Sequence, residues 1–571
     1  MALNQSDRTS EKRTQPRRWN PGLEALLALA ATAFSALLLL LVALHAGPQW
    51  RDEMNTFNVA QMPTLHDFWR NLTFESFPPM WPLLLRGCMA LGWVGSDLSV
   101  RLLGFGVGLL VLGSFWLCAR WLGGRAPGLS MVLIGFLPAF VFIAGSNRAY
   151  GLATFLLVMS FGSLWRLVQA PSRGRILLAF ATCLLFAHCV YYDVVFLAAM
   201  LAGGALVALR RRQWRTLGWL TIIGAVSAGS MVIYLPIIRA GSGFGRFLEW
   251  PDFQPWILWT RLGNALTAAS SSAPKPNGPE IWLWMGLVAV GIVSAGLALQ
   301  ARPPETASAL PPSSPMAGAE QTERAERALF CGTSMLLGVV LYLIFLCLLH
   351  FSTQRWYYVE MLCLCVLALD GLLAANWPGL RPWGWLRIVF MLAMMAWSVQ
   401  GAWLEAHTRR SNVDLIAALL EKQAAPGDFI VVQSVWEGIP FCHYYHGPTP
   451  WETVPPVASH LVHLNDLVFN DAKDPNAMAP VLGQATNALQ SGHAVWFLGN
   501  MWIGPYQTNQ PLRFLTELNR WNTQISSALL QHAVRKQEIE VPSATPVCRL
   551  ECMWLTRFDG YRAGYTNFVA H

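Results

Sequence analysis

Chemically active side chains in this sequence gather in five short segments, and each segment lies directly beside an apolar run. The first holds Asp52 and Glu53 in the order Trp-Arg-Asp-Glu, and the second places Glu75 before Pro78 and Pro79. The other three segments are residues 146–150, 188–193 and 353–358. Ionisable groups at the depth of a membrane are costly, so they usually face a cavity and mark a functional site.

The residue types in these segments indicate acid–base chemistry beside an anion-binding group. A positioned carboxylate can take the proton of a hydroxyl as a general base. A guanidinium binds phosphate through two parallel hydrogen bonds, and Arg148 and Arg355 are the arginines in question. Structural alternatives exist: Asp52 could be a solvated loop charge, Glu75 a charge at the start of a helix, and His188 a satisfied core histidine. An interfacial arginine can also reach lipid phosphate without a catalytic role.

Transmembrane helices are the elements predicted to position these residues. Of the 571 residues, 54% are hydrophobic and 13% are charged, whereas soluble domains have about a quarter charged residues. The 27 Trp residues fit a membrane protein, because indole rings favour the membrane–water interface. The net charge of +8 comes from short arginine clusters between apolar runs. We find no basic face for a nucleic acid.

The apolar runs predict the topology. Those long enough to cross a membrane lie near 23–46, 101–119, 127–145, 149–167, 175–190, 193–209, 216–238, 281–300, 328–349, 356–376 and 383–403. A further run, 79–95, is shorter and contains Pro82, Gly87 and Gly92. If 79–95 does not cross, every short arginine cluster faces the side of the N-terminal tail, as the positive-inside rule requires. We therefore predict about 11 crossings, a non-crossing membrane helix at 79–95 and an external C-terminal region.

This topology divides the chain into a cytoplasmic tail at 1–22, a transmembrane domain at 23–407 and a soluble α/β domain at 408–571. Residues 47–78 form the first external loop, and 301–327 is predicted to be a flexible cytoplasmic linker because it is rich in Pro, Ala, Ser and charge. In the C-terminal domain, buried strands are predicted at 428–433 and 494–499, with a helix at 474–490 between them. The expected fold class is a mainly α polytopic protein of a bacterial inner membrane, with a periplasmic C-terminal α/β domain.

In order and sidedness, the five segments resemble motifs of the C-type glycosyltransferases (GT-C), in particular bacterial relatives of the protein O-mannosyltransferases and of the lipid A aminoarabinose transferase. Trp-Arg-Asp-Glu is similar to the Asp-Glu pair in the first external loop of that family. Glu-Ser-Phe-Pro-Pro-Met is similar to its acidic-x-His-Pro-Pro-Leu motif, with Phe77 in place of the histidine. Ser-Asn-Arg-Ala-Tyr resembles Glu-Ala-Arg-x-Tyr, with Ser146 where an acid is common. His188 and the Arg355-Trp-Tyr run complete a resemblance over about residues 20–400.

The resemblance implies that the protein moves a sugar from a polyprenyl-phosphate carrier to a hydroxyl acceptor on the periplasmic face, with inversion in one step. Asp52 is then the expected base, and Glu53 or Glu75 orients the sugar or the acceptor. Arg148 and Arg355 are the expected ligands of the donor phosphate, where fixed donors stabilise the departing charge.

Three further hydrogen-bond donors, Tyr150, His188 and Tyr357, are expected around that phosphate. The implied partners are the membrane lipid carrier and an acceptor glycan, lipid or protein. No cofactor is expected beyond the lipid-linked sugar. Some C-type transferases use a divalent metal ion, and the metal dependence of this chain stays open, although the resembled branch is expected not to require one and no metal ligand is predicted. The run from His443 to His446 does not indicate a metal site, because neighbours on a strand alternate faces and no second ligand set is visible.

Two other classes of protein share part of this pattern. A polytopic transporter or lipid flippase for a glycolipid would also place ionisable residues in membrane cavities. The acidic loop lies outside the first span, however, and no internal repeat is evident. A membrane-anchored binding protein would have its active part in the C-terminal domain, where no motif is found. The identity of the sugar, the carrier length and the acceptor stay open.

Overall fold

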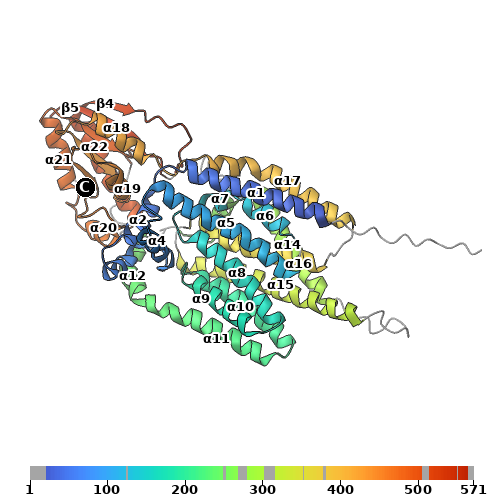
Figure 1. Cartoon of the computed structure of the whole chain (residues 1–571). Coiled ribbons are helices and arrows are strands. Elements are labelled where there is room, and N and C mark those ends of the chain that lie inside the picture. Colours follow the sequence, from blue (N-terminus) through green and yellow to red (C-terminus); the bar gives the residue numbers. More distant parts are fainter. Residues whose placement is uncertain are drawn as a thin grey trace, which may run out of the picture.

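The structure is a computed structural model that describes residues 21–123, 126–248, 253–267, 279–300, 315–350, 353–376, 381–504, 513–549 and 551–563. It is mainly helical, with a mixed α/β domain at one end of a long helical bundle (Figure 1). Nine candidate membrane spans, long and apolar enough to cross, lie within these described ranges. The prediction of a mainly α polytopic membrane protein is therefore confirmed.

The nine candidate spans are built from ten helices, because α11 and α12 form one of them. They are α1 (Pro21–His45), α5 (Asp97–Leu122), α8 (Tyr150–Gln169), α10 (Asp193–Arg210), α11 (Trp214–Ser230), α12 (Leu235–Leu248), α14 (Pro279–Gln300), α15 (Pro315–Leu349), α16 (Val359–Asn376) and α17 (Arg381–Ala406).

Two of the predicted spans are not single long helices, so the predicted count of about 11 exceeds the nine that qualify. The run at 127–145 forms α6 (Gly128–Gly135) and α7 (Pro138–Ile143). The break falls before Pro138, which has no backbone N–H to continue the helix and favours an extended residue before it. The run at 175–190 forms α9 (Arg173–Ala187), whose 15 residues extend about 22 Å, less than the hydrocarbon core of about 30 Å.

The run at 79–95 forms α4 (Met80–Ala90), an 11-residue helix of roughly 16 Å that is too short to cross, as predicted. The other short elements near this end of the bundle are α2 (Arg51–Ala60), α3 (Leu65–Asn71), η1 (Leu72–Phe74), η2 (Met231–Tyr234), α13 (Trp256–Leu266) and η3 (Arg355–Tyr358). Of these short helices, α2, α3, α4, η1 and η2 pack against residues of the C-terminal domain.

The second half of the expected linker, 315–327, is instead helical, because α15 begins at Pro315. Its Ala, Glu, Gln and Arg residues are good helix formers. Glu326 pairs with Arg211 at the end of α10, and Glu323 pairs with Arg327 at 2.7 Å. The first half, 301–314, lies outside the described residues.

The C-terminal domain contains a five-stranded sheet in the order β2-β1-β3-β5-β4. Its elements are α18 (Val413–Gln423), β1 (Phe429–Gln433), α19 (Gly438–Tyr444), β2 (Trp451–Val454), α20 (Asn465–Asp471), α21 (Ala479–Gln490), β3 (Val495–Leu498), α22 (Phe514–His532), β4 (Ala533–Ile539) and β5 (Leu555–Tyr561). β1 is parallel to β2 and β3, and β5 is antiparallel to β3 and β4. β1, β3 and α21 confirm the two strands and the helix expected from the sequence.

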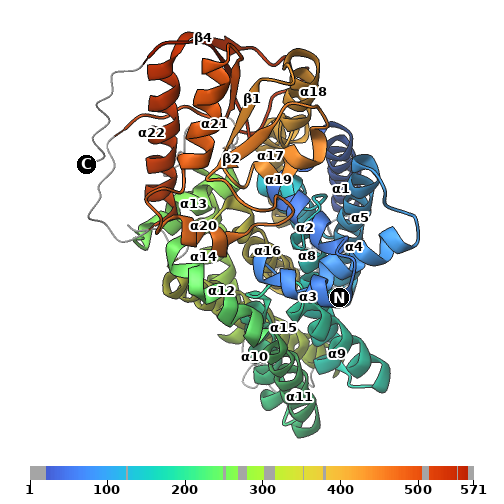
Figure 2. The same cartoon turned by 90° about the vertical axis from the view of Figure 1, so that its left-hand side faces the viewer.

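Helices cover both faces of this sheet (Figure 2). Alternate residues of β1 and β3 pack on α21 and α22 on one face and on α18 and α19 on the other. Because both faces are covered, the two strands are buried apolar runs, as expected for central parallel strands.

The C-terminal domain docks onto α2 and α4 through a buried apolar contact. Ile439 of α19 packs with Met54, Phe57 and Leu85. Beside this contact, Tyr444 donates a hydrogen bond from its hydroxyl to Asp97 at 2.9 Å and accepts one from the backbone N–H of Gln49 at 2.8 Å. This docking places the domain directly over the acidic loop.

Candidate active site

The start of α2 carries Asp52 and Glu53 and is fixed by Glu53. The Glu53 carboxylate accepts a hydrogen bond from the backbone N–H of Trp50 at 3.4 Å, which closes a capping box. Its Oε1 accepts from Arg101 Nη1 at 2.6 Å and from the backbone N–H of Asn147 at 2.9 Å. Glu53 is fully buried. These contacts favour a structural role for Glu53 over the substrate-orienting role predicted for it.

Arg148 lies on the turn between α7 and α8, which packs closely on α5. A Cβ at Gly104 of α5 would meet the carbonyl oxygen of Gly145 at 2.2 Å, so this approach requires glycine. Arg148 Nη1 donates to Glu75 Oε1 and Thr56 Oγ1, both at 2.9 Å, and to the Asp52 carbonyl oxygen at 2.8 Å. The turn therefore brings Arg148 against the acidic loop.

Glu75 and Arg148 form a buried ion pair. Glu75 Oε2 also accepts from Asn55 Nδ2 at 3.1 Å and Thr56 Oγ1 at 2.9 Å. Burial raises the pKa of Glu75 above its ordinary value, and the charge of Arg148 opposes that rise. The ring of Phe77, which replaces the histidine of the related motif, lies 4.4 Å from the Arg148 guanidinium and stabilises it by a cation–π contact.

One edge of the Arg148 guanidinium is only partly engaged in hydrogen bonds. Its Nε is buried without a hydrogen-bond partner among the described residues. Its Nη2 donates to Ser76 Oγ at 3.1 Å and lies 3.9 Å from Asp52 Oδ2. Nε and Nη2 form the side of the guanidinium that matches two oxygens of a phosphate or carboxylate.

Asp52 is the accessible carboxylate of this cluster, with 24% of its side chain exposed. Arg51 Nε, Arg148 Nη2 and His463 Nε2 lie 3.8, 3.9 and 3.9 Å from its oxygens. Within the described residues, no hydrogen bond to either carboxylate oxygen is found. Both carboxylate oxygens of Asp52 are therefore left without a hydrogen bond by the described residues, beside two guanidinium groups.

Tyr150 and Tyr357 lie beside Arg148, as predicted. Their rings contact each other edge to face, with centroids 6.1 Å apart. The charges of Asp52 and Arg148 act on Tyr357. Tyr342 donates a hydrogen bond to the Tyr357 carbonyl oxygen at 2.7 Å and so fixes the backbone of η3.

Two predicted site residues, Arg355 and His188, do not join this cluster. Arg355 makes a bidentate ion pair with Glu405 of α17 at 2.7 and 2.9 Å, and Arg410 binds the same carboxylate at 3.2 Å. The Arg355 side chain therefore ties η3 to α17, and its Nε, like that of Arg148, has no hydrogen-bond partner among the described residues. His188 is hydrogen-bonded through both ring nitrogens, to Tyr234 at 2.5 Å and Ser230 at 3.0 Å.

The C-terminal domain contributes residues to the site that the sequence did not reveal. Arg51 Nε lies 3.1 Å from Glu551 Oε1, and Arg51 Nη1 lies 3.4 Å from Glu437 Oε1. The Arg51 guanidinium also lies 5.5 Å from the Trp436 ring. One sequence signal was available: Trp436 and Glu437 follow β1 closely, and the carboxyl ends of parallel strands are a common place for ligands.

His463 of the same domain completes this side of the site. Its backbone N–H donates to Asn55 Oδ1 at 2.9 Å. Burial lowers the pKa of His463 to about 4, so the ring is neutral at pH 7. No group of three or more His, Cys, Asp and Glu residues that could hold a metal ion is found in the described part of the chain.

Comparison with known proteins gives weak similarity to solved structures. No family model matches the sequence, and no curated protein matches it. ArnT from Cupriavidus metallidurans in the apo state matches at 14% identity, with a TM-score of 0.37 over 82% of this chain and 92% of that chain. A second ArnT structure, bound to undecaprenyl phosphate, gives a TM-score of 0.33.

Two larger proteins also match. The Archaeoglobus fulgidus oligosaccharyltransferase, in complex with Zn and sulfate, has 11% identity and a TM-score of 0.42 over 82% of this chain and 67% of that chain. The arabinofuranosyltransferase AftD from Mycobacteria has 15% identity and a TM-score of 0.42 over 95% of this chain and 40% of that chain. These proteins are C-type glycosyltransferases, the family that the sequence resembles. At such identities and TM-scores the likeness assigns no activity to this chain, and the site residues have to support one.

Proposed function

We propose that this chain is a membrane glycosyltransferase that moves a sugar from a polyprenyl-phosphate carrier to a hydroxyl acceptor, with Asp52 as the general base. The observation that carries the proposal is the contrast among the three acids of the first external loop. Glu53 and Glu75 are buried in ion pairs with arginines, whereas Asp52 is accessible and accepts no hydrogen bond within the described residues. The resemblance of the five segments to C-type transferases supports the reaction class.

In the proposed reaction, Asp52 takes the proton of the acceptor hydroxyl as the acceptor oxygen forms a bond to the anomeric carbon. The bond from that carbon to the phosphate oxygen breaks on the opposite face, so the configuration inverts. Polyprenyl phosphate leaves with the electron pair. The Nε–Nη2 edge of Arg148 and the hydroxyls of Tyr150 and Tyr357 are the proposed donors to its oxygens.

The proposal places the site on the periplasmic face. Asp52 follows the end of α1, while the tail precedes its start, so the two lie at opposite ends of that span. The arginines Arg211 and Arg387 lie toward the end where α1 begins. The positive-inside rule then makes that end cytoplasmic.

An assay of sugar transfer tests the proposal. The purified full chain in lipid nanodiscs is given polyprenyl-phosphate sugars of several classes, and release of polyprenyl phosphate is measured with and without a hydroxyl acceptor. We expect release with at least one donor, and its loss in Asp52→Asn. Absence of release with every donor class, or full release in Asp52→Asn, would contradict the proposed function.

A transporter or flippase remains the second candidate, because one observation favours it. Asp193 of α10 and Glu360 of α16 are buried acids that lie close enough to interact within two candidate spans, and neither carboxyl oxygen of Glu360 has a hydrogen-bond partner among the described residues. Paired acids inside a membrane are typical of proton-coupled transport. Movement of a fluorescent glycolipid across proteoliposomes that is lost in Asp193→Asn but kept in Asp52→Asn would favour this function over transfer.

A further inference from the structure

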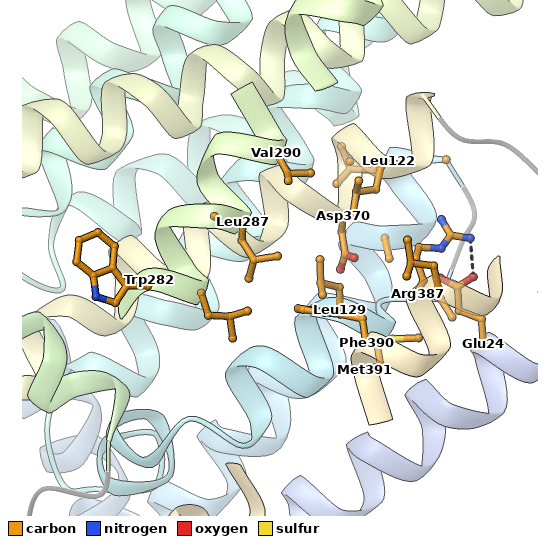
Figure 3. A pocket seen from close by; sticks show the side chains of 18 residues that line it. Glu24, Leu122, Leu129, Trp282, Leu287, Val290, Asp370, Arg387, Phe390 and Met391 are labelled. Atoms are coloured by element: carbon orange, nitrogen blue, oxygen red, sulfur yellow. Dashed lines mark hydrogen bonds and ion pairs between the residues drawn. The ribbon is translucent and has the colours of Figure 1, made fainter. Parts of the chain in front are cut away.

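A second site lies at the other end of the bundle, near the start of α1. It is a cavity of about 610 Å³ bounded by α1, α5, α14, α16 and α17, a volume typical of small-ligand sites. Its walls are apolar except for three ionisable residues, Glu24, Asp370 and Arg387. Figure 3 shows the Asp370 carboxyl directed into the cavity, with the Glu24–Arg387 ion pair beside it.

The cavity opens toward the lipid-facing surface of the bundle. Among its lining residues, Trp282 is 63% exposed and Leu386 is 56% exposed. Exposed apolar side chains on a membrane-spanning helix face hydrocarbon. The lining of α14 continues through Gly286 and Val290, so it offers an apolar path along the helix that suits a lipid chain.

At the polar end of the cavity, some hydrogen-bonding atoms have no partner among the described residues. Asp370 Oδ2 accepts hydrogen bonds from the backbone N–H and the hydroxyl of Ser130, at 3.0 and 2.5 Å. Its Oδ1 accepts none from the described residues. Arg387 Nη2 donates to Glu24 at 2.9 Å, and Arg387 Nε is buried without a hydrogen-bond partner in the described chain. Asp370 Oδ1 and Arg387 Nε therefore both lack a hydrogen-bond partner among the described residues.

The charges at the polar end of the cavity indicate which kind of ligand would bind. Arg387 is already paired with Glu24, so the charge without a partner is that of Asp370. An ammonium group would meet Asp370, and a phosphate on the same headgroup would meet Arg387. A purely apolar occupant would leave a carboxylate unpaired at membrane depth, which is costly. An anionic headgroup would bring like charge to Asp370. A choline headgroup has the right charge but no N–H to donate.

We propose that this cavity binds one phospholipid with a primary amine in its headgroup, the chemistry of phosphatidylethanolamine. The ammonium group donates to Asp370 Oδ1, the phosphate accepts from Arg387 Nε, and one acyl chain lies along α14 past Gly286. This site is separate from the cluster around Asp52, so it stands or falls independently of the proposed function.

Native mass spectrometry of the full chain in detergent tests this site with three phospholipids of identical acyl chains. We expect phosphatidylethanolamine to bind roughly tenfold tighter than phosphatidylcholine or phosphatidylglycerol, the size of one charge-assisted hydrogen bond. Asp370→Asn should remove that preference. Equal binding of the three lipids to the wild-type chain would show an ordinary lipid shell and overturn the proposal.

A pair of glycines on α14 supplies a matched control that leaves the charges intact. A Cβ at Gly286 or at Gly296 meets no heavy atom within 4 Å, so both positions accept a side chain. Gly286 lines the cavity and Gly296 does not. We expect Gly286→Leu to lose phosphatidylethanolamine and Gly296→Leu to retain it. Retention by both variants would overturn the proposal, even where Asp370→Asn fails to fold.

Discussion

Arg51, the residue before the candidate base, is ion-paired with Glu551 near the other end of the sequence, with 3.1 Å between Arg51 Nε and Glu551 Oε1. The same guanidinium reaches Glu437 at 3.4 Å. Arg51 and Asp52 are neighbours in the first turn of α2. The C-terminal domain therefore holds the start of the helix that carries Asp52, and its docking is part of the geometry of the site.

Glu437 and Glu551 should make the folded protein less stable as the pH rises. Burial raises the pKa of Glu437 and of Glu551 above the ordinary value of 4.5, although Arg51 opposes the rise. Below pH 4.5 such an acid is protonated in both the folded and the unfolded protein, and its contribution to stability is fully present. As the pH rises from 4.5 through the raised pKa, the acid ionises first in the unfolded protein, and that contribution is lost. The glutamine of Glu551→Gln is neutral at every pH, so above pH 4.5 the melting temperature of this variant should fall less steeply than that of the wild-type protein.

Melting curves in detergent at several pH values check this expectation. Glu540→Gln, at an exposed position of the same domain, is the matched control and should keep the slope of the wild-type protein. An identical slope in Glu551→Gln would mean that this carboxyl does not set the pH dependence.

Asp52→Asn should abolish activity without unfolding the protein. The change keeps the size of a side chain that is 24% exposed and accepts no hydrogen bond in the described structure. Loss of a general base typically costs about 10²–10⁴-fold in rate. Turnover in the donor-release assay and the melting temperature are measured on the same preparation. Turnover within a few-fold of wild type would remove Asp52 from the role of base.

Glu53→Gln should lower the stability of the protein and keep its activity, the opposite of Asp52→Asn. Glu53 is buried and binds Arg101 at 2.6 Å, so its neutralisation leaves a buried guanidinium without its counter-charge. Removal of one partner of a buried ion pair costs about 3–5 kcal/mol. We expect a clear drop in melting temperature, with turnover per folded molecule kept. A stable but inactive Glu53→Gln variant would instead place this carboxylate in the chemistry.

The sequence predicted the segments of the site better than the roles of their residues. Carboxylates and arginines beside apolar runs were correctly expected to meet, and Asp52, Glu75 and Arg148 do. Arg355 was placed with them because it stands at the start of a span. Its partner Glu405 lies 50 residues further along the chain, and nothing in a local motif indicates such a pair.

The same limit explains two parts of the fold that differ from the prediction. Hydropathy measures how apolar a run is but not whether its helix is continuous, so the break before Pro138 was not foreseen. Pro and Ser at the start of 301–327 suggested a linker, although its second half has strong helix formers that α15 uses. The strands β1 and β3 were predictable because short, fully apolar runs leave few other choices.

Arg148 and Arg355 should differ in their response to substitution. If Arg148 binds the donor phosphate through its Nε–Nη2 edge, Arg148→Lys keeps the charge but loses the paired hydrogen bonds. We expect a raised KM for the donor in Arg148→Lys and a larger loss in Arg148→Ala. Arg355→Lys should lower the melting temperature through its pair with Glu405 and leave the donor KM unchanged. Equal donor KM values for wild type and both Arg148 variants would place the phosphate elsewhere.

His463 should make the protein sensitive to acid. Its folded-state pKa is lowered to about 4 from 6.5 because the ring is buried. Because the pKa of His463 is lowered in the folded protein, the contribution of this residue to stability is present above pH 6.5. It is lost as the pH falls towards 4, since the histidine takes up a proton in the unfolded chain first. Such a shift corresponds to about 3 kcal/mol. In His463→Gln this loss should disappear, so the melting temperature of the variant should fall less than that of the wild type between pH 6.5 and 4. His446→Gln, at an exposed position of the same domain, should behave like the wild type. A His463→Gln variant as acid-sensitive as the wild type would show that another group governs this range.

Because the neutral ring lies 3.9 Å from Asp52, its protonation would also add a positive charge beside the base, so activity should fall with stability over the same pH interval.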